Sequence, residues 1–146
     1  MYGALAALST AYFGPAHEDA LDNRAHHAYW TNESGDPATA RDLYATLITD
    51  HTRVLGPDHE DTLLSRHNHA YYLGRAGASA TARDLYADLI PDSVRILGPD
   101  HEVFLRSRHH HADYVAKAGN SAAARDLYTD LIADRTRVLG PTTNAP

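Results

Sequence analysis

Histidine is the residue type in this sequence whose number and spacing most suggest chemistry. The 146-residue chain contains 11 histidines, and three of them are consecutive in the segment RHHHAD at Arg108–Asp113. Imidazole nitrogens ligate zinc and other transition metals, and residues three or four positions apart share one face of a helix whereas residues two apart do not. His109 and His111 lie two residues apart, and the sequence has no HExxH motif and no two histidines four residues apart. We therefore predict no metal site and no cofactor.

Arginine and aspartate also recur, at Arg24, Arg66 and Arg108 and at Asp42, Asp84 and Asp126. Acid–base or phosphate chemistry would require them to converge in a pocket, and no glycine-rich loop accompanies them. We interpret them as Arg–Asp ion pairs that recur along the chain. No set of nucleophile, base and orienting group can be assembled from these spacings, so we expect no enzymatic activity.

The composition excludes several other classes of partner. The net charge of −6 disfavours a nucleic-acid partner, because neutralising phosphates requires a basic surface. The absence of cysteine fits a reducing compartment, and we expect a cytoplasmic protein. The apolar start MYGALAALSTAYF lacks a basic region and is too short to span a bilayer, so we interpret it as a helix and expect no membrane partner.

The chain is built from an internal repeat of 42 residues. The tripeptide Leu-Gly-Pro begins at Leu55, Leu97 and Leu139, Phe13 begins a variant one period earlier, and ARDLY recurs at the same interval. Residues 55–96 and 97–138 are identical at 27 of 42 aligned positions. A fixed period of this length predicts a stacked helical solenoid. We divide the chain into a leading half-repeat helix (1–12), repeats at 13–54, 55–96 and 97–138, and a tail (139–146).

Each repeat is predicted to form two helices. The second carries an apolar stripe at three- and four-residue steps, which in the first repeat is Ala40, Leu43, Tyr44, Leu47, His51 and Val54. Asp36 is its predicted N-cap, with Pro37 in the first turn, and the next Gly-Pro ends it. Alanines 28, 70 and 112 are expected where two helices approach closely, and Pro91 is expected to kink its helix.

These motifs resemble tetratricopeptide repeats of the 42-residue, kinesin-light-chain-like type. They are also similar to the C-terminal repeat arrays of actinobacterial NB-ARC signalling proteins. The resemblance rests on LGPDHEDTL, SRHNHAYYLGRAG and ARDLYADLIPDSVRI and covers essentially residues 1–141. It implies an all-α fold, a right-handed solenoid of antiparallel helix pairs, in which the first helices line a concave groove. The function it implies is a protein-interaction scaffold that binds a peptide or protein segment, as the sensor part of a larger signalling protein.

The resemblance and the helical spacing together predict the residues that line this groove. Asn68 matches the family's groove asparagine, which hydrogen-bonds the backbone of a bound peptide, and His26 and His110 replace it in the flanking repeats. Variation at these positions fits a surface tuned to one ligand, and drift on a solvated face would look the same. The predicted groove residues are Asp22, His26, Tyr29, Leu64, His67, Asn68, Tyr71, Arg75, Arg106, His109, His110, Asp113 and Lys117.

Two features depart from the family pattern. His27, His69 and His111 stand where the family usually has leucine, and we expect hydrogen-bonded interface residues that loosen the array in mild acid. No dedicated polar cap is visible at either end of the array. The sequence therefore predicts either a piece of a longer array or a structural module that self-associates through uncapped ends, as a homo-oligomer.

Overall fold

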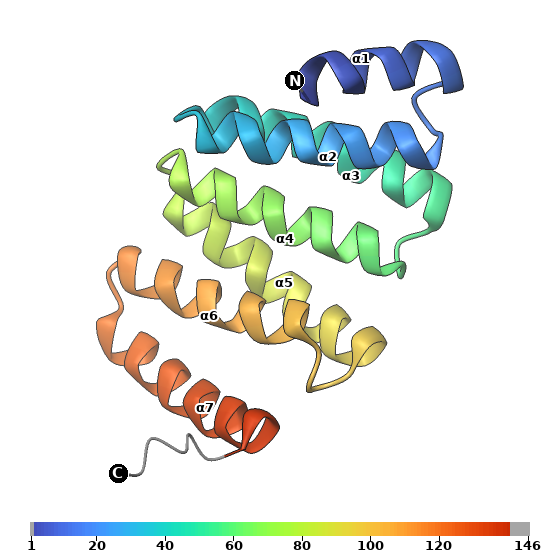
Figure 1. Ribbon diagram of the computed structural model, residues 1–146. Coiled ribbons are helices and arrows are strands. Elements are labelled where there is room, and N and C mark those ends of the chain that lie inside the picture. The colour runs from blue at the N-terminus through green and yellow to red at the C-terminus, as the bar shows by residue number, and fades with distance from the viewer. Residues whose placement is uncertain (1, 141–146) are drawn as a thin grey trace, which may run out of the picture. The chain divides into compact units, whose positions relative to one another are not determined.

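The protein is all-α in the computed structural model, which describes residues 2–140 (Figure 1). Met1 and most of the predicted tail, residues 141–146, lie outside the described residues. Seven helices occupy residues 2–140, and the predicted all-α class is confirmed. They are α1 (Tyr2–Phe13), α2 (Glu18–Glu33), α3 (Pro37–Leu55), α4 (Glu60–Arg75), α5 (Ser79–Leu97), α6 (Glu102–Lys117) and α7 (Ser121–Leu139).

The Gly-Pro turns end the long helices as predicted. Gly56 follows α3 with φ at 92°, a conformation that favours glycine because it has no Cβ atom. The next helix is capped by a histidine side chain: His59 Nδ1 accepts a hydrogen bond from the backbone N–H of Asp61 at 3.1 Å. His17 and His101 cap α2 and α6 in the same way. The phrase LGPDHE therefore encodes a helix stop and a helix start.

The starts of α3 and α7 are fixed by a different cap. Asp36 Oδ1 accepts from the Thr39 N–H at 3.0 Å, and Pro37 occupies the first turn, as predicted. Asn120 does the same for α7, accepting from the Ala123 N–H at 3.1 Å. Side-chain capping satisfies backbone donors that the helix itself leaves unpaired. These local interactions make the helix boundaries readable from the sequence.

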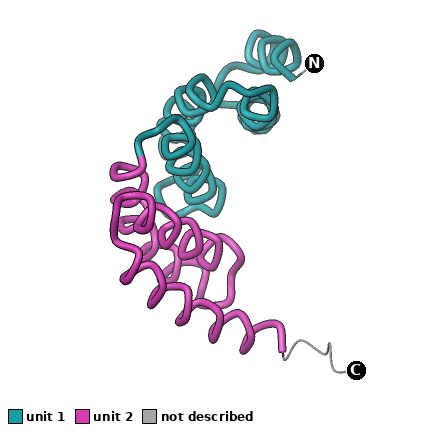
Figure 2. Tube along the Cα trace, turned by 90° about the vertical axis from the view of Figure 1, so that its left-hand side faces the viewer, with its two compact units in different colours: residues 1–78 teal, residues 79–146 magenta. Residues whose placement is uncertain are grey.

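The chain divides into two compact units, residues 1–78 and residues 79–146 (Figure 2). In the first unit α1, α2, α3 and α4 pack in chain order, each antiparallel to the next (Figure 1). Its core contains Leu21, Ala28, Ala40, Tyr44, Leu47 and Tyr72. Ala28 and Ala70 are fully buried, which confirms the predicted close approach of helices at these small residues.

In the second unit α5 packs on α6, and α6 packs on α7. Phe104, Leu105 and Leu131 form one apolar cluster of this unit, with Ile90 and Val94 against it. Helix α5 continues through Pro91, which lacks the N–H that would bond the carbonyl four residues earlier. The kink expected there stays a prediction.

The Arg–Asp pairs form with different partners from those predicted. Arg24 Nη1 donates to Asp50 Oδ2 at 2.7 Å, and Arg108 Nη1 donates to Asp134 Oδ2 at 2.5 Å. Asp42, the expected partner in ARDLY, instead accepts from its neighbour Arg41. The prediction was wrong because antiparallel packing brings the start of α2 against the end of α3, where Asp50 lies. Asp42 lies at the other end of α3.

The three histidines at the family's leucine position lie between neighbouring helices, as expected. His27 lies against Gly3 of α1, and an added Cβ at Gly3 would be 3.1 Å from His27 Nε2. His69 lies near Arg41 and Asp42, and burial lowers its pKa most, with Arg41 also lowering it. Among residues 2–140 none of the three rings, His111 included, makes a hydrogen bond, so that part of the prediction is wrong. No helix in this range combines the length and apolar character that a bilayer span requires.

Candidate functional site

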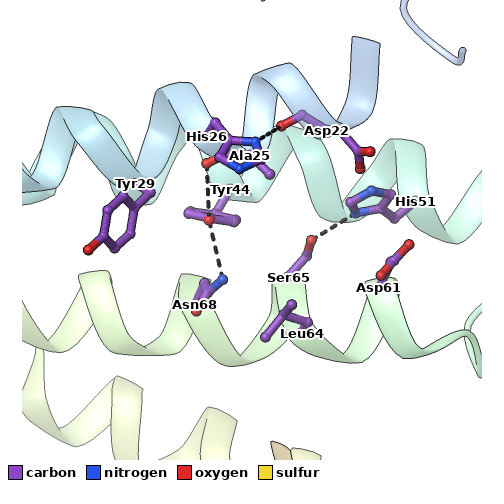
Figure 3. A pocket seen from close by; sticks show the side chains of 10 residues that line it. All are labelled: Asp22, Ala25, His26, Tyr29, Tyr44, His51, Asp61, Leu64, Ser65 and Asn68. Atoms are coloured by element: carbon purple, nitrogen blue, oxygen red, sulfur yellow. Dashed lines mark hydrogen bonds between the residues drawn. The ribbon is translucent and has the colours of Figure 1, made fainter. Parts of the chain in front are cut away.

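The first unit contains a concave pocket between α2 and α4, with α3 as its floor (Figure 3). Its volume is about 300 Å³. Apolar and polar side chains from all three helices contribute to it. The lining residues are Asp22, Ala25, His26, Tyr29, Tyr44, His51, Asp61, Leu64, Ser65 and Asn68.

A chain of hydrogen bonds crosses the pocket from α4 to α2. Asn68 Nδ2 donates to Tyr44 Oη at 3.2 Å, and that hydroxyl donates to the Ala25 carbonyl at 3.3 Å (Figure 3). Tyr44 is 3% exposed and stacks on Tyr72, with ring centroids 5.4 Å apart. Burial raises the pKa of Tyr44 to about 12, although the Asn68 hydrogen bond lowers it, so the phenol keeps its proton. The Asn68 amide is therefore held in one orientation by a buried, neutral partner.

His51 forms a second polar contact in the same pocket. Its Nδ1 lies 2.8 Å from Ser65 Oγ, and both residues are buried (Figure 3). Burial lowers the pKa of His51 most, Arg24 and His59 lower it further, and Asp61 and Asp22 raise it. The net lowering favours a neutral imidazole at neutral pH. The two carboxylates make this end of the pocket acidic.

The exposed aromatic ring of Tyr29 lies at the opposite side of the pocket (Figure 3). Tyr29 is 45% exposed and meets Trp30 edge to face, with centroids 5.2 Å apart. His26 Nδ1 lies 2.9 Å from the Asp22 carbonyl, and its ring stacks on Tyr2 of α1 at 5.2 Å. These contacts keep the imidazole of His26 on the α2 rim.

The second unit brings together three further side chains of α6. His109 Nε2 lies 3.5 Å and His110 Nδ1 lies 3.7 Å from the same oxygen, Oδ2 of Asp113. The other carboxylate oxygen, Oδ1, accepts a hydrogen bond from Tyr128 Oη of α7. Burial lowers the pKa of His110 to about 4, with the charge of His109 acting in the same direction. Burial raises the pKa of Tyr128, as do its hydrogen bond to Asp113 and that carboxylate's charge.

Comparison with known proteins identifies the family to which the chain belongs. The tetratricopeptide repeat family model matches residues 28–61 and 62–102, which together are half of the chain. This chain is a tetratricopeptide repeat protein. Such repeats are generally protein-interaction modules and are typically non-catalytic. No curated protein matches the sequence.

Solved structures support the same fold for this tetratricopeptide repeat protein. It is similar to the nearly identical TPR-like repeats of a candidate kinesin light chain from Podosopora anserina, with a TM-score of 0.80 and 19% identity over 94% of this chain. That structure is of a form with one substitution, and the structure of the repeats without it gives a TM-score of 0.78 and 19% identity over 95% of this chain. The present chain spans 65% and 66% of those two chains.

In this tetratricopeptide repeat protein, the groove residues predicted for the first unit do not all lie in one place. Five of them line the pocket of the first unit: Asp22, His26, Tyr29, Leu64 and Asn68. Tyr71 and Arg75 lie further along α4, where Arg75 Nη1 donates to Tyr71 Oη at 3.2 Å. His67 is 1% exposed, so its side chain does not contribute to an open surface, and that assignment is corrected. Adjacent helical residues point about 100° apart, so His67 and Asn68 face different surroundings.

The groove residues predicted for the second unit also lie in different surroundings. Arg106 is exposed, and the Lys117 ammonium lies 5.0 Å from the ring centroid of Tyr114. His109, His110 and Asp113 converge as described above. The spacing of the histidines alone does not reveal this group, because its third member is Asp113, which lies four residues after His109 and three after His110. Tyr44 and His51 also line the pocket, although their spacing predicted a role in packing, and Ser65 lines it without any signal in the sequence pattern.

Proposed function

We propose that this tetratricopeptide repeat protein binds an extended peptide segment of a partner protein in the pocket between α2 and α4. The observation that carries the proposal is the oriented amide of Asn68. One of its N–H groups is used on Tyr44. Within residues 2–140 the second N–H and Oδ1 make no hydrogen bond. An extended peptide backbone presents one acceptor and one donor, which match this pair.

The rest of the pocket indicates the side chains such a peptide would carry. Tyr29 and Leu64 offer an apolar and aromatic surface beside Asn68. Asp22 and Asp61 place two carboxylates at the other end, and the whole chain has a net charge of −6. Opposite charges attract and speed association. We therefore expect a peptide with an apolar residue followed or preceded by lysine or arginine.

The proposal is tested by selecting binders from a phage-displayed library of random peptides with the full chain. The affinity of the selected peptides is then measured by fluorescence anisotropy. Asn68→Ala is expected to weaken binding about 10-fold, the effect of losing one or two hydrogen bonds. Thr46→Ala, an exposed change on α3 outside the pocket, is the matched control and should leave the affinity unchanged. Selected peptides that bind Asn68→Ala and Tyr29→Ala as tightly as the parent would contradict the proposal.

We also propose that the chain is the recognition part of a larger signalling protein and has no catalytic activity of its own. Support comes from the family, whose repeats are generally interaction modules. To test this, the chain is fused to a reporter domain whose signal changes when the selected peptide binds. The signal of this fusion is compared with that of the same fusion carrying Asn68→Ala. Equal signals from both would contradict a recognition role for this pocket.

A second candidate function is self-association through the helices at the two ends of the array. Large apolar side chains are exposed on α1, where Leu8 is 66% and Tyr12 is 84% exposed, and on α7, where Ile132 is 64% and Leu139 is 76% exposed. Contact between an α1 face and an α7 face of another copy would be head-to-tail and would form chains. Light scattering as a function of concentration tests this. A mass that stays at 16.0 kDa would exclude self-association over the concentrations tested.

A further inference from the structure

His109, His110 and Asp113 on α6 have the donor atoms and spacing of a transition-metal site. The two nitrogens lie 3.5 and 3.7 Å from one carboxylate oxygen. These separations exceed the 2.7–3.2 Å typical of N–H···O hydrogen bonds. Ligands at about 2.0–2.2 Å from a tetrahedral zinc ion lie about 3.3–3.6 Å from one another. The His109 separation lies within this range, the His110 separation is close to it, and one donor atom from each of the three residues lies within 4.8 Å of the others, so the spacing is compatible with three ligands around one ion.

We propose that His109, His110 and Asp113 bind one divalent transition-metal ion, with zinc as the reference ion. Two imidazoles and one carboxylate are a donor set for zinc and other first-row metals, whereas calcium and magnesium prefer oxygen ligands alone. The side chain of His109 is 48% exposed and that of Asp113 is 36% exposed, so an ion can reach the donors from solvent. Remaining coordination positions would be filled by water.

Tyr128 of α7 completes the arrangement as a positioning residue. Its hydroxyl donates to Oδ1 of Asp113, whereas both imidazoles approach Oδ2. A hydrogen bond to the second oxygen of a ligating carboxylate fixes the orientation of that carboxylate. The hydroxyl therefore directs Oδ2 toward the two histidines and connects the site to a second helix.

The repeat itself shows that the fold does not require these residues. At the equivalent positions the first repeat has Ala25, His26 and Tyr29, and the second has His67, Asn68 and Tyr71. Only the third repeat places three ligand-type side chains together within residues 2–140. Arg106 adds a permanent positive charge that acts on His110 and opposes cation binding. The negative charge of Asp113 offsets that effect.

The experiment is isothermal titration of the full chain, free of any affinity tag, with Zn²⁺ at neutral pH. We expect saturable binding of one ion per chain, which Mg²⁺ does not displace. Substituting Co²⁺ should produce the visible absorption of a cobalt ion with mixed nitrogen and oxygen ligands. No saturable binding by the parent chain would overturn the proposal.

The zinc affinities of single variants test whether the ion binds to these residues. His110→Asn introduces the residue of the second repeat and should weaken binding at least about 100-fold, as should His109→Ala at the more exposed position. Tyr128→Phe should weaken zinc binding about 10-fold and leave the cobalt spectrum in place, because it removes orientation but no ligand. His26→Ala, the equivalent histidine of the first repeat, is the matched control and should leave affinity unchanged. An equal loss in His26→Ala, or none in His109→Ala and His110→Asn, would show that the ion binds elsewhere.

Discussion

Arg24 and Asp50 form a hydrogen-bonded ion pair that joins α2 to α3, with Nη1 and Oδ2 2.7 Å apart and both side chains 18% exposed. Arg24 Nη1 also donates to the Pro15 carbonyl at 3.1 Å, so one guanidinium connects the turn before α2, α2 itself and α3. Burial alone would raise the pKa of Asp50, but hydrogen bonds from Arg24 and Arg53 outweigh it and lower the pKa. The carboxylate therefore stays charged at neutral pH, where the pair holds the two helices together.

Replacing Arg24 with methionine should lower the free energy of unfolding by about 1–2 kcal/mol. The change leaves the Asp50 carboxylate and the Pro15 carbonyl without this donor, and partly buried charged hydrogen bonds contribute on this scale. Urea denaturation followed by circular dichroism measures the loss. Arg125→Met is the control, because Arg125 and Asp126 are both 77% exposed and 3.7 Å apart, and should change stability little. Equal stabilities of the two variants would contradict this account.

The stability of the fold should fall in mild acid. Burial lowers the pKa of His51 and of His69 in the folded protein, whereas an unfolded histidine titrates near about 6.5. As the pH falls through that value, the unfolded chain takes up protons that the folded chain does not, so the free energy of unfolding decreases. This contribution is complete above about pH 7.5 and is lost toward the lower folded-state pKa values.

Thermal unfolding at about pH 7.5 and about pH 5.5 tests this prediction. The double variant His51→Gln, His69→Gln should show a smaller change in Tm between the two pH values than the parent. A parent chain with the same Tm and helicity at both pH values would rule the explanation out.

Tyr44→Phe should disturb the pocket without changing its shape. The substitution removes the hydroxyl that accepts from Asn68 and donates to Ala25, and should lower the free energy of unfolding by about 1 kcal/mol. The Asn68 side-chain amide, no longer held, should exchange its protons with water faster. NMR of the side-chain NH₂ group measures this rate. Thr46→Ala should leave it unaltered, and an unchanged rate in Tyr44→Phe would contradict the positioning role.

The cap of α7 provides a local prediction. Asn120→Ala removes the acceptor for the Ala123 N–H and should lower the free energy of unfolding by about 1 kcal/mol. Asn120→Asp keeps an oxygen at the cap and should retain most of the stability. Urea denaturation distinguishes the two variants. The same loss in both would show that the amide group has some role other than capping.

The sequence by itself determined the helices and their limits. The 42-residue interval, the Gly-Pro stops and the caps at Asp36 and Asn120 all act within a few residues of the chain, so they are readable without a fold. The apolar stripe of α3 was also largely predictable, since Ala40, Tyr44 and Leu47 are buried, although Val54 is 40% exposed.

Tertiary structure decided which side chains meet. The partner of Arg24 depends on antiparallel packing, which sets Asp50 rather than Asp42 opposite α2. The role of Tyr44 depends on Asn68, which lies 24 residues away on another helix. The single carboxylate oxygen shared by His109 and His110 depends on Tyr128, since its hydroxyl occupies the other oxygen. Local sequence specifies backbone hydrogen bonds and caps, whereas contacts between helices depend on their axial offset and rotation, which no short pattern encodes.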